Sequence, residues 1–175
     1  MTADRVLLIG MMGSGKSAVG AEISSRTGWP YRDNDSTVAE IAGVDTATLL
    51  ERDGVDALRD AESTALRRAV ADPGPLVAGV AAGVVERTED LELLRGCDAL
   101  VAYLHTPLDV LVERVGDGAG RPFLQPDPAA ALTRLLVGRE PLYREVADLV
   151  VDTHQGDAAD HAAQVLATLR AETGR

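Results

Sequence analysis

The chain has 175 residues, of which 46% are hydrophobic but only 3% aromatic, so a single domain with an aliphatic core is expected over residues 1–175. Its formal net charge of -11 argues against nucleic acid and anionic membranes as partners, because both are bound through an excess of lysine and arginine. One cysteine and no apolar run near the roughly 20 residues that span a bilayer predict a soluble cytoplasmic protein, which we expect to be monomeric.

The first expected strand, Arg5–Ile9, leads into a glycine-rich loop and then a helix to about Thr27. From Gly10 the loop reads GMMGSGKS, which satisfies the pattern G-x-x-x-x-G-K-[ST] between a strand and a helix. Glycines let successive backbone N–H groups turn toward phosphate oxygens, and the positive end of the helix adds to them. Lys16 is the only lysine among 17 basic residues, and it stands where this motif requires one. The sequence therefore predicts a loop that binds a nucleoside triphosphate.

We expect the nucleotide to bind along the whole loop and the start of the following helix. Lys16 should reach the β- and γ-phosphates as a catalytic residue, and the Ser17 hydroxyl should bind Mg²⁺. A glycine-rich turn without a ligand is the alternative, which the motif and its context together disfavour. The residues expected to bind nucleotide here are Gly10, Met11, Met12, Gly13, Ser14, Gly15, Lys16, Ser17 and Ala18.

A second extended run, Trp29–Tyr31, ends in the acidic stretch Asp33-Asn34-Asp35. The two aromatic residues are expected to pack this strand. Alternating carboxylates can share a direction, so one can serve Mg²⁺ while the other accepts a proton from a substrate hydroxyl or orients it. A solvated acidic turn is the alternative, since acidic turns are common in a chain this acidic.

The rest of the chain alternates between helix-length and strand-length segments. Asp72–Pro75 is a break, and Gly116–Pro128 is a glycine- and proline-rich loop around Arg121. Strands separated by helices predict an α/β fold with a parallel sheet covered on both faces, whose ligands bind at the carboxyl ends of the strands. Further helices are expected at Thr46–Arg52, Val55–Ala71, Glu86–Leu94, Pro107–Val115, Ala129–Tyr143 and Ala158–Thr173, and further strands at Leu76–Val80, Asp98–Leu104 and Leu149–Val151.

Three classes of protein commonly use such a loop: switch GTPases, motor ATPases and small-molecule kinases. A GTPase needs the guanine-reading pattern N-K-x-D, which a chain with Lys16 as its only lysine does not contain. A motor ATPase usually carries an acid after a buried strand, whereas Leu76–Val80 continues into Ala81-Ala82-Gly83. The acidic stretch after the second strand therefore favours a small-molecule kinase.

The chain resembles the shikimate kinases, a family within the nucleoside-monophosphate-kinase-like P-loop group, from Arg5 to about Asp152. The resemblance implies a three-layer α/β/α P-loop kinase fold with a central five-stranded parallel sheet and a mobile lid at about residues 116–128. It also implies ATP- and Mg²⁺-dependent phosphorylation of shikimate, a step of aromatic amino acid biosynthesis. Its markers are the GMMGSGKS loop, the D-x-D of Asp33 and Asp35, Arg59-x-x-Glu62, Arg121-Pro122, and REPLY from Arg139 to Tyr143 followed by Ala147-Asp148.

The resemblance implies a role for each residue that matches near the phosphates. Asp33 would help to hold Mg²⁺, and Asp35 would contact the substrate hydroxyl as a base or orienting group. Arg121 would move in with the lid, contact the nucleotide and neutralise charge on the transferring phosphoryl group as a catalytic residue. Arg114 matches an arginine that lies near the nucleotide.

At the acceptor, the resemblance implies that Arg59 and Arg139 bind the substrate carboxylate and that Glu62 orients them. Two arginines aimed at one carboxylate make charge-assisted contacts that select a planar acid. Arg59 and Glu62 could instead be an ordinary helix pair worth ~0.2–0.5 kcal/mol. The joint spacing of these residues favours the substrate-binding role.

The sequence departs from the family where three consecutive glycines are usual after the third strand. Here the triplet falls on Val80-Ala81-Ala82 or on Ala81-Ala82-Gly83, and it is broken in either register. A backbone N–H of Ala81 or Ala82 could still meet the substrate carboxylate. If the stretch needs positive φ, however, alanine would be strained and the chain would have to follow a different path.

The acceptor pocket therefore differs from the family pattern while the phosphate machinery matches it. Leu50 and Leu58 also stand where the family often has aromatic residues. The leading hypothesis is transfer of phosphate from ATP to shikimate. One alternative is a divergent kinase acting on another cyclitol, sugar or sugar acid, and a second is a non-catalytic nucleotide-binding regulator.

Overall fold

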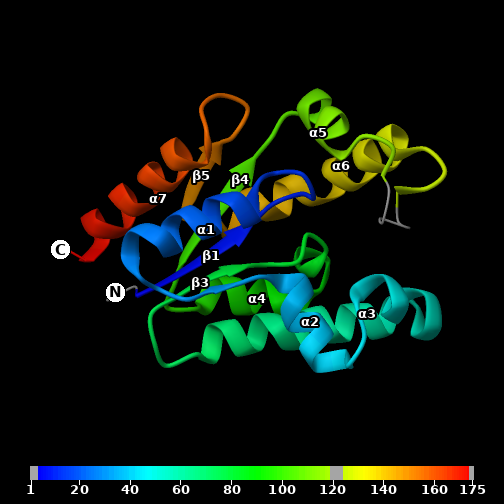
Figure 1. Cartoon of the computed structure of the whole chain (residues 1–175), viewed down its shortest axis with the longest axis horizontal. Helices are drawn as coiled ribbons and strands as arrows, with labels where there is room; N and C mark the ends of the chain where they lie inside the picture. The colour runs from blue at the N-terminus through cyan, green and yellow to red at the C-terminus, as the bar shows by residue number, and fades with distance from the viewer. Residues whose placement is uncertain (1–3, 119–123, 174–175) are drawn as a thin grey trace.

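The computed structural model describes residues 4–118 and 124–173. Within them, five parallel strands form one sheet in the order β2-β3-β1-β4-β5 (Figure 1). The strands are β1 Arg5–Ile9, β2 Tyr31–Arg32, β3 Leu76–Gly79, β4 Leu100–His105 and β5 Leu149–Asp152. The helices are α1 Lys16–Thr27, α2 Asn34–Ala42, α3 Thr46–Ala71, α4 Thr88–Gly96, α5 Leu108–Val115, α6 Pro128–Val146 and α7 Ala158–Thr173, with a short 3₁₀ helix η1 at Val84–Glu86. The predicted α/β fold with a five-stranded parallel sheet is confirmed.

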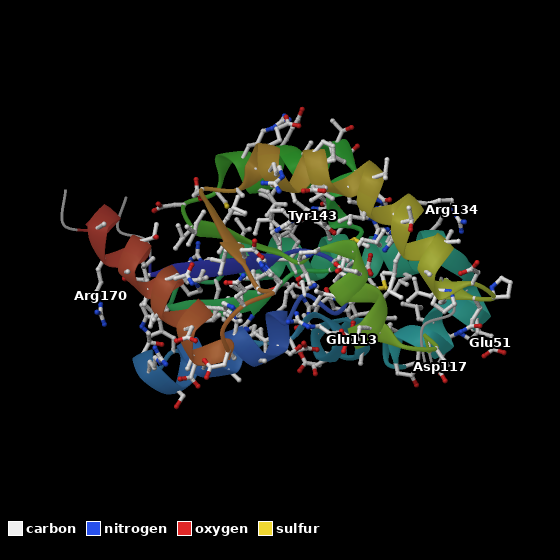
Figure 2. The ribbon with its side chains drawn as sticks, turned by 90° about the horizontal axis from the view of Figure 1, so that it is seen from above. Glu51, Glu113, Asp117, Arg134, Tyr143 and Arg170 are labelled. Atoms are coloured by element: carbon white, nitrogen blue, oxygen red, sulfur yellow. The ribbon has the colours of Figure 1, made fainter. Side chains whose placement is uncertain are left out.

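The sheet is covered by helices on both faces because successive side chains of each buried strand point to opposite sides. Val6 and Leu8 of β1 pack with side chains of α1 and α7, which lie side by side in Figure 1. Leu7 and Ile9 pack on the other face with side chains of α3, α4, α5 and α6. Figure 2 shows Tyr143 of α6 directed into the interior, where it is fully buried. The core is aliphatic apart from a few such rings.

Helix α3 is two helical segments joined at a break, as the sequence predicted. Gly54 lies between them with φ 86° and ψ 179°, a conformation that only glycine adopts easily. The second segment carries Leu58 and Arg59 into the interior, where Leu58 packs against Val38 of α2. The break therefore sets the direction in which the second segment meets the rest of the domain.

Helix α2 was not predicted, and it changes the setting of the acidic stretch. Asp33 is its N-cap: the side chain accepts hydrogen bonds from the backbone N–H groups of Asp35 and Ser36. Aspartate is a preferred N-cap residue, so this signal was present in the sequence. Asp33 and Asp35 thus do not alternate along a strand end but occupy the cap and the first turn of a helix.

Several other boundaries differ from the prediction by one to three residues, and part of the predicted lid is not described. The expected helix Glu86–Leu94 begins later, at Thr88, because the chain first turns through η1. Of the predicted lid, residues 119–123, including Arg121, lie outside the described residues. In the part of the chain that is described, no helix has the length and apolar character to cross a membrane.

Candidate active site

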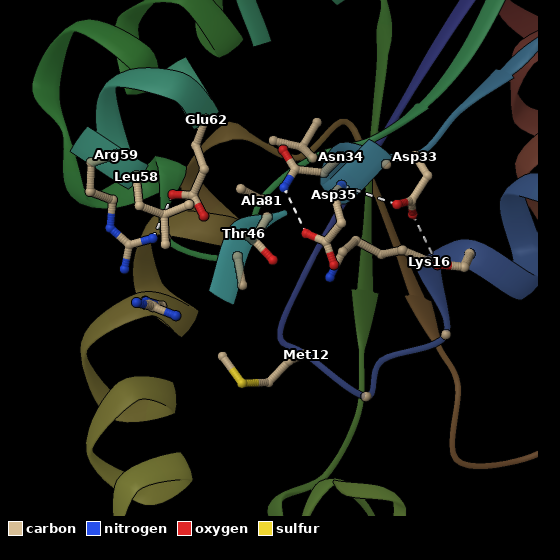
Figure 3. A pocket seen from close by; sticks show the side chains of 18 of the residues that line it. Met12, Lys16, Asp33, Asn34, Asp35, Thr46, Leu58, Arg59, Glu62 and Ala81 are labelled. Atoms are coloured by element: carbon tan, nitrogen blue, oxygen red, sulfur yellow. Dashed lines mark hydrogen bonds and ion pairs between the residues drawn. The ribbon is translucent and has the colours of Figure 1, made fainter. Parts of the chain in front are cut away.

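A cavity of about 500 Å³ opens at the carboxyl ends of the strands, where the fold class predicts ligands. Its wall combines the loop after β1, the start of α2, both segments of α3, the chain after β3, and α6. Figure 3 shows Lys16, Asp33 and Asp35 together at one end and Arg59 with Glu62 at the other. We call these the phosphate end and the acceptor end of the cavity.

The backbone of the loop after β1 depends on its glycines. Gly10, Gly13 and Gly15 have φ values of 140°, 83° and 94°, in the region that side chains disfavour. A Cβ on Gly10 would also come within 2.7 Å of the carbonyl oxygen of Leu104 on β4. No side chain caps the start of α1, so its first N–H groups remain available to an anion.

The loop uses its residues in two ways. Met12, Gly13 and the run from Gly15 to Ala18 line the cavity. The side chains of Met11 and Ser14 are instead buried, and Met11 belongs to the hydrophobic core. Any contribution of these two residues to phosphate binding must therefore come from their backbone.

Lys16 folds back over the loop in this structure. Its Nζ donates to the carbonyl oxygens of Gly10 and Met11, at 2.7 and 2.9 Å. Burial lowers the pKa of this ammonium from 10.5 to about 8, although the carboxylates of Asp35 and Asp33 oppose the shift. Figure 3 shows the side chains of Lys16 and Asp35 directed toward one another. This buried cation is well placed to exchange the two carbonyl oxygens for phosphate oxygens when a nucleotide binds.

The Asp33 carboxylate has two different edges. Its Oδ2 accepts from the N–H of Asp35 at 3.0 Å and so holds the start of α2. Its Oδ1 accepts from the hydroxyls of Ser17 and Tyr31, both at 3.3 Å. A carboxylate and a hydroxyl side by side are oxygen ligands of the kind that Mg²⁺ takes together with nucleotide phosphates. Ser17 and Asp33 therefore fit the predicted metal site, by direct contact or through water.

Tyr31 has a larger part in this end of the cavity than packing its strand. A Cβ on Gly20 would overlap its ring, and a Cβ on Gly79 would lie 2.8 Å from its hydroxyl, so two glycines make room for it. Burial raises the pKa of Tyr31 to about 12, which keeps the phenol protonated as a donor to Asp33. Sequence reasoning missed this contact because it depends on tertiary packing.

Arg59 and Arg139 meet at the acceptor end, as predicted, although 80 residues separate them. Arg59 Nη1 lies 2.5 Å from Glu62 Oε2. Burial raises the pKa of Glu62, and the charges of Arg59 and Arg139 oppose the shift. Arg139 donates from Nε and Nη2 to the two carboxylate oxygens of Glu86, each at 3.0 Å. Glu86 was not predicted, and no motif in the sequence identifies it.

The broken glycine triplet is accommodated without strain. No non-glycine residue among those described has a positive φ, so Ala81 and Ala82 lie in ordinary conformations and the anticipated strain is absent. Gly83 has φ −89°, but a Cβ there would overlap the guanidinium of Arg59. The absence of a side chain at Gly83 thus leaves room for the guanidinium of Arg59. Ala81 and Ala82 line the cavity beside it.

Arg114 lies outside the cavity wall but against the phosphate loop. Its Nη2 donates to the carbonyl oxygen of Thr153 at 2.7 Å, and its Nη1 donates to that of Gly13 at 3.3 Å. It therefore links α5 to the loop and to the segment after β5, beside the expected nucleotide.

The chain is similar to known proteins in sequence and in fold. A family model described as shikimate kinase matches residues 12–170. A shikimate kinase from Halorhodospira halophila is 36% identical over 172 residues, which cover 98% of this chain and 96% of that protein. One from Thioalkalivibrio sulfidiphilus is 38% identical over 149 residues, covering 85% of this chain and 77% of that protein. The structure of a shikimate kinase from Acinetobacter baumannii in complex with shikimate superposes with a TM-score of 0.92 at 30% identity, covering 99% of this chain and 97% of that one.

Proposed function

Since this chain belongs to the shikimate kinase family, we propose that it transfers the γ-phosphoryl group of ATP to a hydroxyl of shikimate, giving shikimate 3-phosphate and ADP. The observation that most supports this proposal is the arrangement of phosphate-binding and carboxylate-binding groups in one cavity. A loop suited to phosphates and a pair of arginines suited to a carboxylate face each other, with Asp35 beside Lys16 near the loop. An acceptor that is both an acid and an alcohol fits between them.

At the phosphate end, the loop backbone and Lys16 would bind and orient the triphosphate. Ser17 and Asp33 would hold Mg²⁺, which when bound neutralises charge on the phosphate oxygens. Lys16 would leave its carbonyl partners for the β- and γ-phosphates, and Arg114 would support the loop from outside. We propose that the lid brings Arg121 to the transferring group, as the family resemblance implies.

At the acceptor end, Arg59 and Arg139 would hold the substrate carboxylate, with backbone N–H groups near Ala81 and Ala82 beside it. The ring hydroxyl would then lie near Asp35, which accepts its proton or orients it. As the acceptor oxygen bonds to the γ-phosphorus, the bond from that phosphorus to the ADP oxygen breaks, and the hydroxyl proton passes to Asp35. Catalysis on this scheme comes from positioning and charge neutralisation.

A coupled assay of ADP release tests the proposal. We expect saturable, shikimate-dependent turnover, and a rate no higher than without an acceptor would contradict it. A panel of other cyclitols, sugars and sugar acids tests the divergent-kinase alternative. ATP binding without any phosphorylated product across the panel would instead favour a regulator.

The same assay tests Asp35. For Asp35→Asn we expect turnover to fall by about 10²–10⁴, the usual range for losing a positioned acid–base group, with nucleotide affinity nearly unchanged. The separation is expected because Asp35 Oδ1 accepts a hydrogen bond from Asn34, while Asp35 acts on Lys16 of the phosphate loop through its charge alone. Parallel loss of turnover and nucleotide affinity would contradict this role.

A further inference from the structure

Among the described residues, four charged side chains meet at the acceptor end, and Glu86 is one of them. Its carboxylate binds Arg139 through both oxygens, and its Oε2 also lies 3.6 Å from Arg59 Nη2. Glu62 pairs with Arg59 from the other side. The two positive and two negative formal charges cancel, so the group as a whole has no net formal charge.

The cancellation of these charges is important because Arg139 is buried. The side chain of Arg139 is only 3% exposed, so solvent screens its charge weakly. Glu86 is 42% exposed, more than any other member of the group, and it is the last residue of the short 3₁₀ helix η1. A change at Glu86 can therefore alter the charge of the acceptor end without opening the core.

Glu86 also determines which hydrogen-bond donors of Arg139 remain available to a ligand. It takes the edge formed by Nε and Nη2, an edge that binds carboxylate or phosphate through two parallel hydrogen bonds. Arg139 lines the cavity, whereas Glu86 is not part of the cavity wall. Glu86 thus holds the guanidinium from behind and presents its remaining donors to the substrate.

We propose that Glu86 is a specificity-determining residue that makes the acceptor end accept a monoanionic acid and reject polyanions. This inference rests on the proposed function, since it concerns the site for the acceptor carboxylate. Without Glu86 the two arginines would be balanced by Glu62 alone, and the net positive charge would attract phosphate-like dianions. With Glu86 in place, geometry rather than net charge selects the ligand, and a second negative charge gains nothing.

The test compares Glu86→Gln with the wild type, using inorganic sulfate as the dianionic probe. Inhibition is measured against shikimate at saturating ATP and, separately, against ATP at saturating shikimate. We expect the variant to show a Ki for sulfate against shikimate that is ~10-fold lower, because a dianion gains most when a nearby negative charge is removed. The KM for shikimate should fall less, and the KM for ATP and the Ki for sulfate against ATP should stay unchanged.

Two further variants separate charge from other effects. Glu86→Asp keeps the negative charge and should retain a Ki for sulfate within about twofold of the wild type, since the charge term dominates. Glu22→Gln is the matched control: Glu22 is a similarly exposed partner of Arg26 on α1 and does not line the cavity. It should change none of these constants.

An unchanged Ki for sulfate in Glu86→Gln, or a raised KM for shikimate without that change, would overturn the proposal and leave Glu86 an orienting group only. If the variant does not fold, the wild type still decides: sulfate must compete with shikimate more weakly than the monoanion benzoate does, and stronger competition by sulfate overturns the proposal. Absence of shikimate turnover in the wild type would instead refute the proposed function, so the two failures are distinct.

Discussion

The two ends of the cavity differ in the part of the chain that forms them, backbone at one end and side chains at the other. The phosphate end is mainly backbone: one contiguous loop whose glycines at positive φ shape it, plus the start of a helix. The acceptor end is mainly side chains, brought from α3, η1 and α6 and held by ion pairs. A backbone site depends on a short local sequence, whereas a side-chain site depends on the whole fold. We therefore expect that changes at the acceptor end alter selectivity while nucleotide binding is retained.

Among the changes that compare the two ends, the largest effect is expected at Lys16, the main side chain of the phosphate end. We expect Lys16→Met to lower kcat/KM for ATP by about 10³, as for loss of a principal electrostatic donor in a closed site. Stability should not fall, because methionine removes a charge whose burial is unfavourable, as its lowered pKa shows. Steady-state kinetics and thermal melting measure the two quantities. A loss below tenfold would mean that the backbone alone holds the triphosphate.

Gly83→Ala tests the acceptor end, as Lys16→Met tests the phosphate end. The new Cβ would overlap the guanidinium of Arg59, so we expect the KM for shikimate to rise about 10–100-fold, as when a positioning group is displaced by around 1 Å. The KM for ATP should change little.

The neighbouring alanine supplies the control for Gly83. Ala82→Gly restores a glycine where the backbone needs none, so its effect should be small. Equal effects of Gly83→Ala on both substrates would show that the two ends are not separable.

The pH dependence should also distinguish the ends. Lys16 has a lowered pKa of about 8, so kcat/KM for ATP should fall above that pH, by roughly tenfold at pH 9 as the ammonium is lost. The KM for shikimate should not follow, because arginine stays charged. In Lys16→Arg, kcat/KM for ATP should no longer fall above about pH 8. If the fall persists, a group other than Lys16 causes it.

Folding stability should respond to the same group with the opposite trend. In the nucleotide-free protein the folded state releases this proton at a lower pH than the unfolded chain does. Between about pH 8 and 10.5 the unfolded chain therefore binds more protons, and this group makes the free energy of unfolding rise with pH. Lys16→Met should lack this contribution in denaturant titrations across that range.

The same contrast explains what the sequence could predict. The phosphate loop, the strand and helix that flank it and the break near Gly54 are local patterns, and the structure has them where expected. The convergence of Arg59 and Arg139 was expected only through a family resemblance. Glu86 and the hydroxyl of Tyr31 were missed, because their partners lie 53 residues away or depend on the space left by Gly20 and Gly79. Helix α2 was missed although its cap residue was visible.

The smallest expected effect lies at Tyr31, a side chain that acts within the backbone-built end. Tyr31→Phe keeps the ring that fills the space beside Gly20 but removes the donor to Asp33 Oδ1. Loss of one such bond is worth about 1 kcal/mol, so the Mg²⁺ concentration for half-maximal activity should rise about fivefold. Mn²⁺ binding to the ADP complex, followed by electron paramagnetic resonance, should weaken similarly, while the KM for shikimate stays constant. A shifted shikimate KM with unchanged metal binding would show that Tyr31 serves the acceptor end, and the division between the two ends would have to be redrawn through β2.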